Sequence, residues 1–271
     1  MNKNLLITFG CSWTYGLGVG YQPGQTKNEY RAIAWDSSIC NLKSFRGILS
    51  KRFALDNKNF AHGRSSNQAQ FYYAKKYFGG RDPSNNQEFL QYDKNIKESN
   101  FNKDRETYNN IIVLHAITST SRNVFFDLET MSVVHQKYTN PSKFSEFMVK
   151  HSYNHDYEIQ QLYTEMNFWN VFYKSVGIKN IWIDTFNHHH YYQPIDNMID
   201  LDDRDLLSQL CIRNNMKNFD KNYHHSNQNI DSNRVAFLVE IGLLNPISNH
   251  PTEKGHIQIA EIIAPVLESK L

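Results

Sequence analysis

The chain has 271 residues and a formal net charge of +2, from 29 basic and 27 acidic residues. Hydrophobic residues make up 40% of it and aromatic residues 14%, which is typical of a globular protein and excludes a chain disordered throughout. The balanced charge offers no electrostatic footprint for nucleic acid or for an anionic membrane, so we expect neither as a partner.

Cysteine usage and the N-terminal segment point to a cytoplasmic protein. Cys11, Cys40 and Cys211 are widely spaced, which matches neither a disulfide framework nor a zinc-thiolate site. The apolar run Leu5–Phe9 is too short for the core of a signal peptide, and no stretch reaches the length of a membrane span. We therefore expect the chain to remain in the cytoplasm.

In the first half of the chain, apolar runs alternate with helical spacing. Leu5–Phe9 predicts a buried strand that stops at Gly10. Further on, the pattern predicts a helix over 41–55, a weak strand over 57–60, and a helix from 66 to 78. Ser66 is the expected N-cap of that last helix, and Gly79-Gly80 is its expected end.

The second half continues the alternation. The pattern predicts strands at 111–114 and 181–183, a polar loop at 115–122, and helices over 153–176, within 201–212 and over 257–267. Val235–Val239 reads as either a fifth strand or a helical piece, and Thr252 as the N-cap of the closing helix.

Strands alternating with helices predict an α/β protein. We expect a three-layer α/β/α, flavodoxin-like fold with a parallel sheet of about five strands. The chain has no internal repeat or low-complexity linker, so we expect a single domain over 1–271. Residues 186–248 are polar and rich in His and Asn, and we expect them to form a long, lid-like insertion.

Two short segments at opposite ends of the chain suggest chemistry. Gly10-Cys11-Ser12 follows a predicted strand, which places the Ser12 hydroxyl at the carboxyl edge of the sheet, where open α/β sheets bind ligands. His250 lies just before the closing helix. A serine hydroxyl with an imidazole base is the basic unit of nucleophilic acyl transfer.

The chain resembles the SGNH hydrolases, also called the GDSL esterase family, in four short blocks. Gly10-Cys11-Ser12 matches the family's Gly-Asp-Ser, and the 59–67 segment matches its second block, with Gly63 in place. Thr118 stands in the third block, where the family carries Asn. His250-Pro251 and the following Gly255-His256 match the last block. The resemblance extends over nearly the whole chain.

The resemblance implies a role for each matching residue. Ser12 would be the nucleophile and His250 its base, while the backbone amides of Ser12 and Gly63 and the Thr118 hydroxyl would hold the oxyanion. No cofactor or metal is implied. The expected substrate is a small-molecule or glycan ester, with an acetyl-like acyl group on a carbohydrate.

The chain also departs from the family. Ile247 occupies the position of the usual acid, three residues before His250, and no Asn stands in the third block. A backbone carbonyl or Asp184 could take the place of the acid. The composition is similar to that of phage-encoded members, which would allow a location in the virus particle.

Two alternatives share the fold. An inactive SGNH-type protein, serving as a glycan-binding or structural component of a phage particle, would explain the missing acid and Asn. An acyltransferase would use the same Ser12 and His250 but would pass the acyl group to a sugar. In a purely structural interpretation of the same residues, Ser12 is only a helix cap and Cys11 is only a small buried hydrophobic residue.

Other polar residues are assigned to substrate contact. His188, Tyr191 and Arg122 are expected to face the substrate, with Tyr191 stacking on a sugar ring. The histidines at 188–190 and 224–225 lack metal-ligand spacing, so we expect no metal site. The run Gly16-x-Gly18-x-Gly20 lacks the spacing of a dinucleotide-binding loop.

Overall fold

A computed structural model describes residues 3–63, 65–79, 100–120, 122–127, 132–137, 154–186, 191, 193–202, 204–216 and 232–271. Within these ranges, no helix is both long enough and apolar enough to cross a membrane.

The centre of the molecule is a four-stranded parallel sheet in the order β2-β1-β3-β6. Its strands are β1 (Asn4–Phe9), β2 (Leu55–Asn59), β3 (Asn110–Ile117) and β6 (Lys179–Asp184). The chain moves from β1 to one neighbour, β2, and then returns to the other neighbour, β3. The gap between β1 and β3 is therefore the switch point at which open sheets bind ligands.

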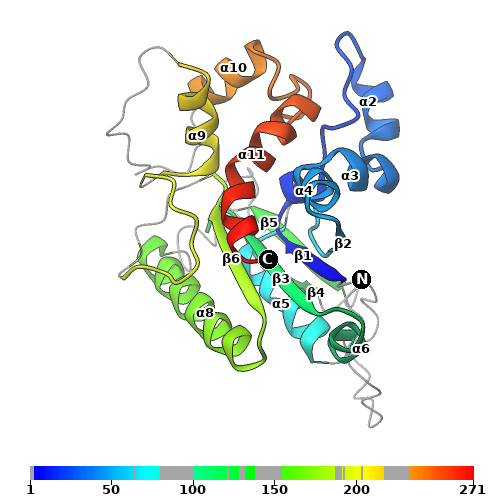
Figure 1. Cartoon of the computed structure of the whole chain (residues 1–271). Helices are drawn as coiled ribbons and strands as arrows, with labels where there is room; N and C mark the ends of the chain where they lie inside the picture. Colours follow the sequence, from blue (N-terminus) through cyan, green and yellow to red (C-terminus); the bar gives the residue numbers. More distant parts are fainter. Residues whose placement is uncertain are drawn as a thin grey trace.

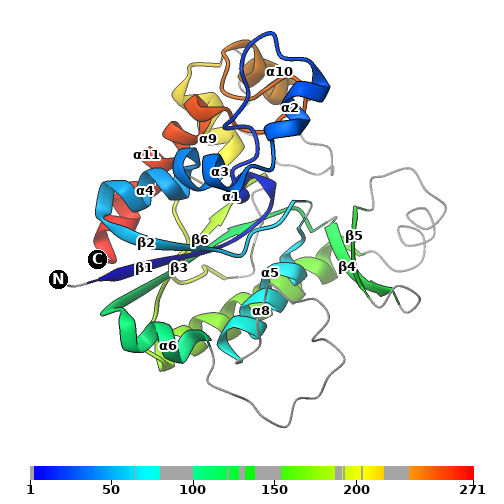
Figure 2. The same cartoon turned by 90° about the vertical axis from the view of Figure 1, so that its right-hand side faces the viewer.

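Helices cover both faces of this sheet, which makes the three predicted layers (Figures 1 and 2). The helices on one side are α4 (Phe45–Phe53), α9 (Leu206–Arg213), α10 (Ser232–Glu240) and α11 (Glu253–Ser269). Those on the other side are α5 (Asn67–Phe78), α6 (Asn100–Thr107) and α8 (His155–Ser175).

Alternating strand residues supply the two cores. Leu6 and Ile112 point into the core shared with α4, α9 and α11, whereas Leu5, Ile7 and Val113 point into the core shared with α5 and α8. All five are fully buried. Strands buried on both faces explain why β1 and β3 read as continuous apolar runs in the sequence.

Three smaller helices follow β1 in the chain: α1 (Ser12–Tyr15), α2 (Lys27–Ile33) and α3 (Ser37–Lys43). Their starts are well specified. Thr26 and Glu29 form a capping box on α2, and the Asp36 carboxylate accepts backbone N–H bonds at the start of α3.

Most predicted elements are confirmed. Ser66 caps α5 by accepting the Ala69 N–H at 3.1 Å, and Thr252 caps α11 by accepting the Gly255 N–H at 3.3 Å. Cys11 is fully buried, as expected of a small hydrophobe.

Other sequence expectations were wrong in detail. The described parallel sheet has four strands rather than about five, and Val235–Val239 takes the helical alternative of its prediction, within α10. The helix predicted over 41–55 is divided into α3 and α4 by Ser44, whose extended backbone ends one helix and caps the next. The strand predicted at 111–114 runs on through Ile117, so the loop begins later than expected.

A separate antiparallel hairpin lies beside the main sheet. Its strands are β4 (Arg122–Asp127) and β5 (Ser132–Lys137). Of the predicted insertion at 186–248, the structure describes α9, α10 and the segments next to them, so its lid-like role stays a prediction.

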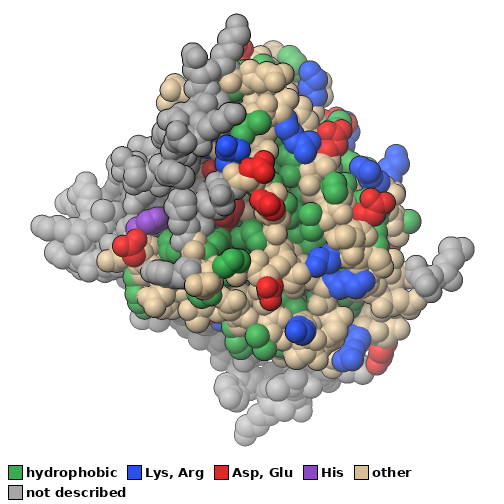
Figure 3. All heavy atoms as spheres, turned by 60° about the vertical axis from the view of Figure 1, so that its left-hand side comes forward, with side chains coloured by type: hydrophobic (Ala, Val, Ile, Leu, Met, Phe, Trp, Pro, Cys, Tyr) green, Lys and Arg blue, Asp and Glu red, His purple; other side chains and the backbone are tan. Residues whose placement is uncertain are grey.

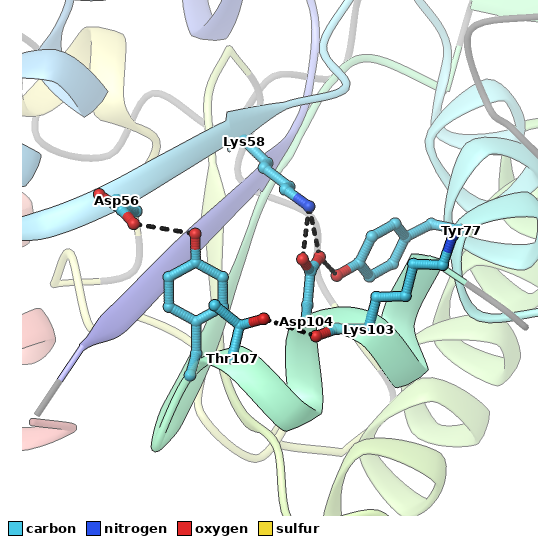
Figure 4. Close-up of polar contacts among 7 residues, drawn as sticks. Asp56, Lys58, Tyr77, Lys103, Asp104 and Thr107 are labelled. Carbon is cyan, nitrogen blue, oxygen red and sulfur yellow. Dashed lines mark hydrogen bonds and ion pairs between the residues drawn. The ribbon is translucent and has the colours of Figure 1, made fainter.

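A buried carboxylate attaches α6 to the rest of the fold (Figure 4). Asp104 on α6 accepts two bonds of 2.6 Å from Lys58 on β2, and a further short bond from the Tyr77 hydroxyl on α5. Asp104 is only 6% exposed, so these bonds form largely away from solvent. It joins three elements on the face of the sheet opposite α4 and α11.

The surface agrees with the balanced composition. On the face drawn in Figure 3, acidic and basic side chains are interspersed, with apolar side chains between them. Among the described residues that this view shows, neither sign of charge dominates.

Candidate active site

Ser12 lies at the tight turn between β1 and the single-turn helix α1. It is the first residue of α1, and Cys11 occupies the N-cap position without a side-chain capping bond. Ser12 is therefore not a capping residue. Gly10 makes the turn possible, because a Cβ at this position would lie 2.1 Å from Thr14 Oγ1. The first N–H groups of a helix have no partner within the helix, so the Ser12 backbone N–H is suited to donate to a ligand.

A pocket of about 550 Å³ opens in front of Ser12. It is lined by Ser12 and Trp13 of α1, by Val235, Ala236 and Val239 of α10, and by Ser248, Asn249 and His250 of the loop before α11, among others. Ser12 and His250 thus come from opposite ends of the chain to one pocket. The apolar side chains of α10 form a wall beside them.

The loop that carries His250 is closed on itself by Asn245. Asn245 donates from its backbone N–H and from Nδ2 to the His250 carbonyl, at 2.9 and 3.0 Å. Its Oδ1 accepts from the backbone N–H groups of Ile247 and Ser248, at 3.2 and 2.8 Å. Asn245 is fully buried, so the loop has a fixed internal frame.

Ser248 is a hydrogen-bond partner of the His250 side chain. The two are joined by a 2.8 Å hydrogen bond between His250 Nδ1 and Ser248 Oγ. Ile247, the position of the usual acid, adds only an aliphatic side chain at this point. The described contact of His250 Nδ1 is therefore with a hydroxyl.

Gly18 brings the serine and histidine loops into contact. A Cβ on Gly18 would lie 2.2 Å from the Pro251 carbonyl oxygen and 3.0 Å from His250 Cβ, and its φ of +105° is in the left-handed region. The glycines at 16–20 thus have a packing reason. Gly18 lets the chain after Ser12 pass directly against the chain after His250, whereas Gly16 packs against Ser44 and Cys40 and Gly20 against Ile33.

Gly63 lies on the neighbouring loop, after β2. The N–H of His62 donates to the Gly10 carbonyl at 3.3 Å, which places this loop beside the turn that holds Ser12. The exposed ring of Trp35 covers Gly63, since a Cβ there would lie 2.3 Å from the ring. The role of the Gly63 amide in an oxyanion hole stays a prediction.

Thr118 is placed less favourably. Its side chain is fully buried, its hydroxyl has no partner among the described residues, and it does not belong to the lining of the pocket. Asn67 on α5 instead holds its backbone, by donating to the Thr118 carbonyl at 2.8 Å and accepting its N–H at 2.9 Å. The role of the Thr118 hydroxyl in an oxyanion hole stays a prediction.

The three expected substrate contacts stay predictions. Arg122 is the first residue of β4, and His188 falls outside the described residues. The Tyr191 hydroxyl donates to Asp184 at 3.1 Å, and burial is the main cause that raises its pKa well above the usual value. Asp184 itself lies at the end of β6 and is 3% exposed.

Two further groups support the site from behind. His256 on α11 is fully buried and accepts the Phe45 N–H at Nδ1; burial lowers its pKa to about 3. The buried Arg46 guanidinium donates to the carbonyls of Thr14 and Tyr15, each at 3.1 Å, and so holds the end of α1. Neither residue was assigned a role from sequence.

No group of metal-ligating side chains is present in the part of the chain that the structure describes. The two histidine runs that raised the metal question, 188–190 and 224–225, lie outside that part. The absence of a metal site stays a prediction.

Sequence reasoning missed Ser248, Asn245 and Tyr30. Ser248 and Asn245 lie only two and five residues before His250, so a search for hydroxyl and amide side chains just before His250 could have found them. Tyr30 contacts Ser248 at 3.1 Å from α2, and no local spacing marks a contact across so long a stretch of chain.

The fold and the pocket define an α/β/α protein with a serine and a histidine at the switch point of a parallel sheet. No protein-family model and no curated protein sequence matches the chain.

Three of the solved structures that are similar to it cover nearly all of the chain. One is a protein from Desulfitobacterium hafniense DCB-2 assigned to a lipolytic G-D-S-L family, with 13% identity, a TM-score of 0.38, and coverage of 98% of this chain and 99% of that one. Another is a carbohydrate esterase family 2 enzyme with a carbohydrate-binding domain from Corynascus thermopiles, with 11% identity, a TM-score of 0.43, and coverage of 100% and 67%. The third is the acetyl xylan esterase Est2A from Butyrivibrio proteoclasticus, with 11% identity, a TM-score of 0.41, and coverage of 100% and 64%.

Proposed function

We propose that this protein is a serine-dependent ester hydrolase of the SGNH type, which removes an acetyl-like acyl group from a carbohydrate. The observation that carries the proposal is the meeting of Ser12 and His250 in one pocket at the carboxyl edge of the sheet. Their order along the chain and the blocks around them are those of the family that the sequence resembles.

In the proposed reaction, His250 takes the proton from Ser12 as the hydroxyl attacks the ester carbonyl. The backbone N–H of Ser12, unpaired within its helix, and the amide of Gly63 stabilise the negative charge on the carbonyl oxygen. The alcohol leaves with the proton from His250, and water then attacks the acyl-enzyme by the same route in reverse. Losing one oxyanion donor costs about 3–4 kcal/mol of barrier, so a hole without the family's Asn would give a slower enzyme.

The pocket supports an acyl ester as the substrate class. Val235, Ala236 and Val239 present an apolar wall suited to the acyl chain, while Ser248 and Asn249 bring polar groups to the same space. Both kinds of contact are needed to hold a molecule with an acyl chain and a sugar-like alcohol.

The test is a fluorophosphonate probe, which reacts with activated serines, followed by mapping of the adduct by mass spectrometry. We expect an adduct on Ser12 that is absent in Ser12→Ala and in His250→Ala. Ser269→Ala, a serine at the far end of α11, is the matched control and should label as the original protein does. Hydrolysis of acetylated sugars should then follow the same ranking, and a fully active Ser12→Ala protein would refute the proposal.

The lack of an acid at Ile247 and of the family's Asn donor in the third block favours a second candidate, a non-catalytic protein of the same fold that binds glycans. Without that donor and without an acid, the site could retain a sugar and not turn it over. Glycan binding by a protein that neither reacts with the probe nor hydrolyses esters would support this candidate over the first.

A further inference from the structure

Trp35 differs from the other tryptophans of the chain because much of its side chain lies in solvent. It is 56% exposed, whereas Trp13, Trp169 and Trp182 are 4%, 2% and 0% exposed. A buried indole ring stabilises a core, but an exposed one leaves a large apolar surface in water. Core packing therefore does not explain the position of Trp35.

The backbone of Trp35 is held between two helices. Ala34 is the C-cap of α2, and Asp36 is the N-cap of α3. The Asp36 N–H donates to the Ile33 carbonyl at 3.0 Å, and the Asp36 carboxylate accepts the Ser38 N–H at 2.9 Å. A ring that is already held in place loses little conformational freedom when a ligand contacts it, which favours binding.

The indole ring contacts both segments that carry the candidate site on the β2 side of the sheet. Its six-membered ring covers Gly63, because a Cβ there would lie 2.3 Å from Cη2 and 3.2 Å from Cζ3 of Trp35. The ring centre of Trp35 is 5.4 Å from that of Tyr15, the last residue of α1. Ser12 is the first residue of the same helix, so Trp35 lies close to the predicted nucleophile.

The strand order places Trp35 and the pocket toward opposite edges of the sheet. Gly63 follows β2, Ser12 follows β1, and Phe186 of the pocket lining follows β6. In the order β2-β1-β3-β6, β1 lies between the strands that lead to Gly63 and to Phe186. An ester with its acyl group in the pocket and its carbonyl carbon at Ser12 can therefore extend its alcohol toward Trp35.

An exposed indole ring favours a sugar as that alcohol. A pyranose ring has C–H groups on its faces and hydroxyl groups around its edge. It can therefore lay an apolar face on an aromatic side chain while its hydroxyls stay in water. A small alkyl alcohol has too little surface to gain from the same contact.

We infer that Trp35 is a specificity-determining residue: the exposed face of its indole ring stacks on the pyranose that carries the acyl group. The inference rests on the proposed function, because it names the part of that site that recognises the alcohol. Trp35 contacts the sugar and not the reacting atoms. It therefore contributes to the binding of carbohydrate esters and not to the chemical step.

The kinetic test compares substrates that share an acetyl group and differ in the alcohol. The sugar esters are mono-acetylated methyl pyranosides of the gluco, xylo and manno series, and the ester without a ring is ethyl acetate. We expect Trp35→Ala to raise the KM for the pyranosides about tenfold, with kcat within about twofold, and to leave kcat/KM for ethyl acetate unchanged. Trp35→Tyr, which keeps an aromatic ring, should recover much of the affinity.

Phe168→Ala is the matched control, because Phe168 is 57% exposed and lies on α8, on the other face of the sheet. It should change the kinetics of neither substrate. Equal losses with both substrates in Trp35→Ala would show that Trp35 supports the Gly63 loop instead of a sugar. That result, or no loss with either substrate, would overturn the inference and leave the hydrolase proposal standing.

Shielding of Trp35 from acrylamide tests binding without turnover, in the Ser12→Ala protein. Because the other three tryptophans are buried, acrylamide should mainly quench the fluorescence of Trp35, and this component should be missing in Trp35→Phe. We expect the same mono-acetylated pyranosides to shield it and ethyl acetate not to. Shielding, together with no hydrolysis by the original protein, would count against the hydrolase proposal alone. Absence of shielding by any of the pyranosides would overturn the inference, whatever the activity.

Discussion

Gly18 combines a left-handed backbone conformation with close contact to the loop that carries His250. Its φ is +105°, and a Cβ would lie 2.2 Å from the carbonyl oxygen of Pro251, next to His250. Gly24 has a similar φ of +88° and no atom within 4 Å of a Cβ. Comparing alanine substitutions at Gly18 and Gly24 therefore separates the loss of stability caused by the left-handed backbone from the loss caused by steric overlap.

We expect Gly24→Ala to lower the free energy of unfolding by about 1–2 kcal/mol, the cost of a left-handed alanine. Gly18→Ala should cost about 2–4 kcal/mol, because steric overlap adds to the same strain. It should also slow Ser12 labelling by displacing the His250 loop. Urea unfolding and probe kinetics on both variants check this, and equal losses of stability would show that the loops do not touch.

At the level of elements, the position of α1 depends on α4. The single-turn α1 has too few internal hydrogen bonds to be stable alone. Arg46 of α4 donates to the carbonyls of Thr14 and Tyr15 and to the side chains of Asn41 and Asn57. It is 1% exposed, and its bonds therefore form away from water.

We expect Arg46→Met to lower the free energy of unfolding by about 2–4 kcal/mol, because several buried oxygens lose their donor. Lys51→Met, on the exposed side of the same helix, should change it by less than about 0.5 kcal/mol. The measurement is chemical unfolding followed by circular dichroism. Arg46→Lys should recover little of the loss, since an ammonium cannot reproduce the fork of a guanidinium; full recovery would contradict this account.

Elements that the sequence predicted well have causes that are local. β1 and β3 are continuous apolar runs, and α5 and α11 have a hydroxyl at the cap. The secondary-structure prediction failed where a single residue interrupted a helix or where tertiary packing determined the type of element. Ser44 divides what spacing presented as one helix, and the packing of α10 decides against a fifth strand.

In the candidate site, too, features with local causes were predicted and features that depend on tertiary packing were not. The positions of Ser12 and His250 followed from strand order and from block order, which are properties of the chain. The contact between Ser248 and His250 did not follow, because it depends on how the loop before α11 folds, with Tyr30 of α2 beside it. A search limited to acids could not have found it.

At the scale of the whole molecule, three buried groups link stability to pH. Burial lowers the pKa values of His115 and His256 to about 3, and raises that of Asp205 to about 6 in spite of its ion pair with Arg234. His115 lies in the core between the rings of Phe9 and Trp182, so it is neutral in the folded protein.

The signs of these effects oppose one another. On unfolding between about pH 4 and pH 6, each histidine regains a value near 6.5 and takes up a proton, which destabilises the fold as pH falls. Asp205 regains a value near 3.8 and releases a proton, which destabilises the fold as pH rises. Two protons are taken up and one is released, so the net effect of the three is a stability that declines with falling pH.

We therefore expect the free energy of unfolding to be lower at pH 5 than at pH 7, with a contribution from these groups of about 1.4 kcal/mol per pH unit between pH 4 and 6. His115→Phe keeps the ring stack and should flatten this dependence, because one uptake then balances one release. Asp205→Asn should steepen it towards two protons. Urea titrations at several pH values compare slopes rather than absolute stabilities, which removes the cost of each substitution itself. A His115→Phe protein with an unchanged slope would show that His115 is not the neutral core residue inferred from its burial.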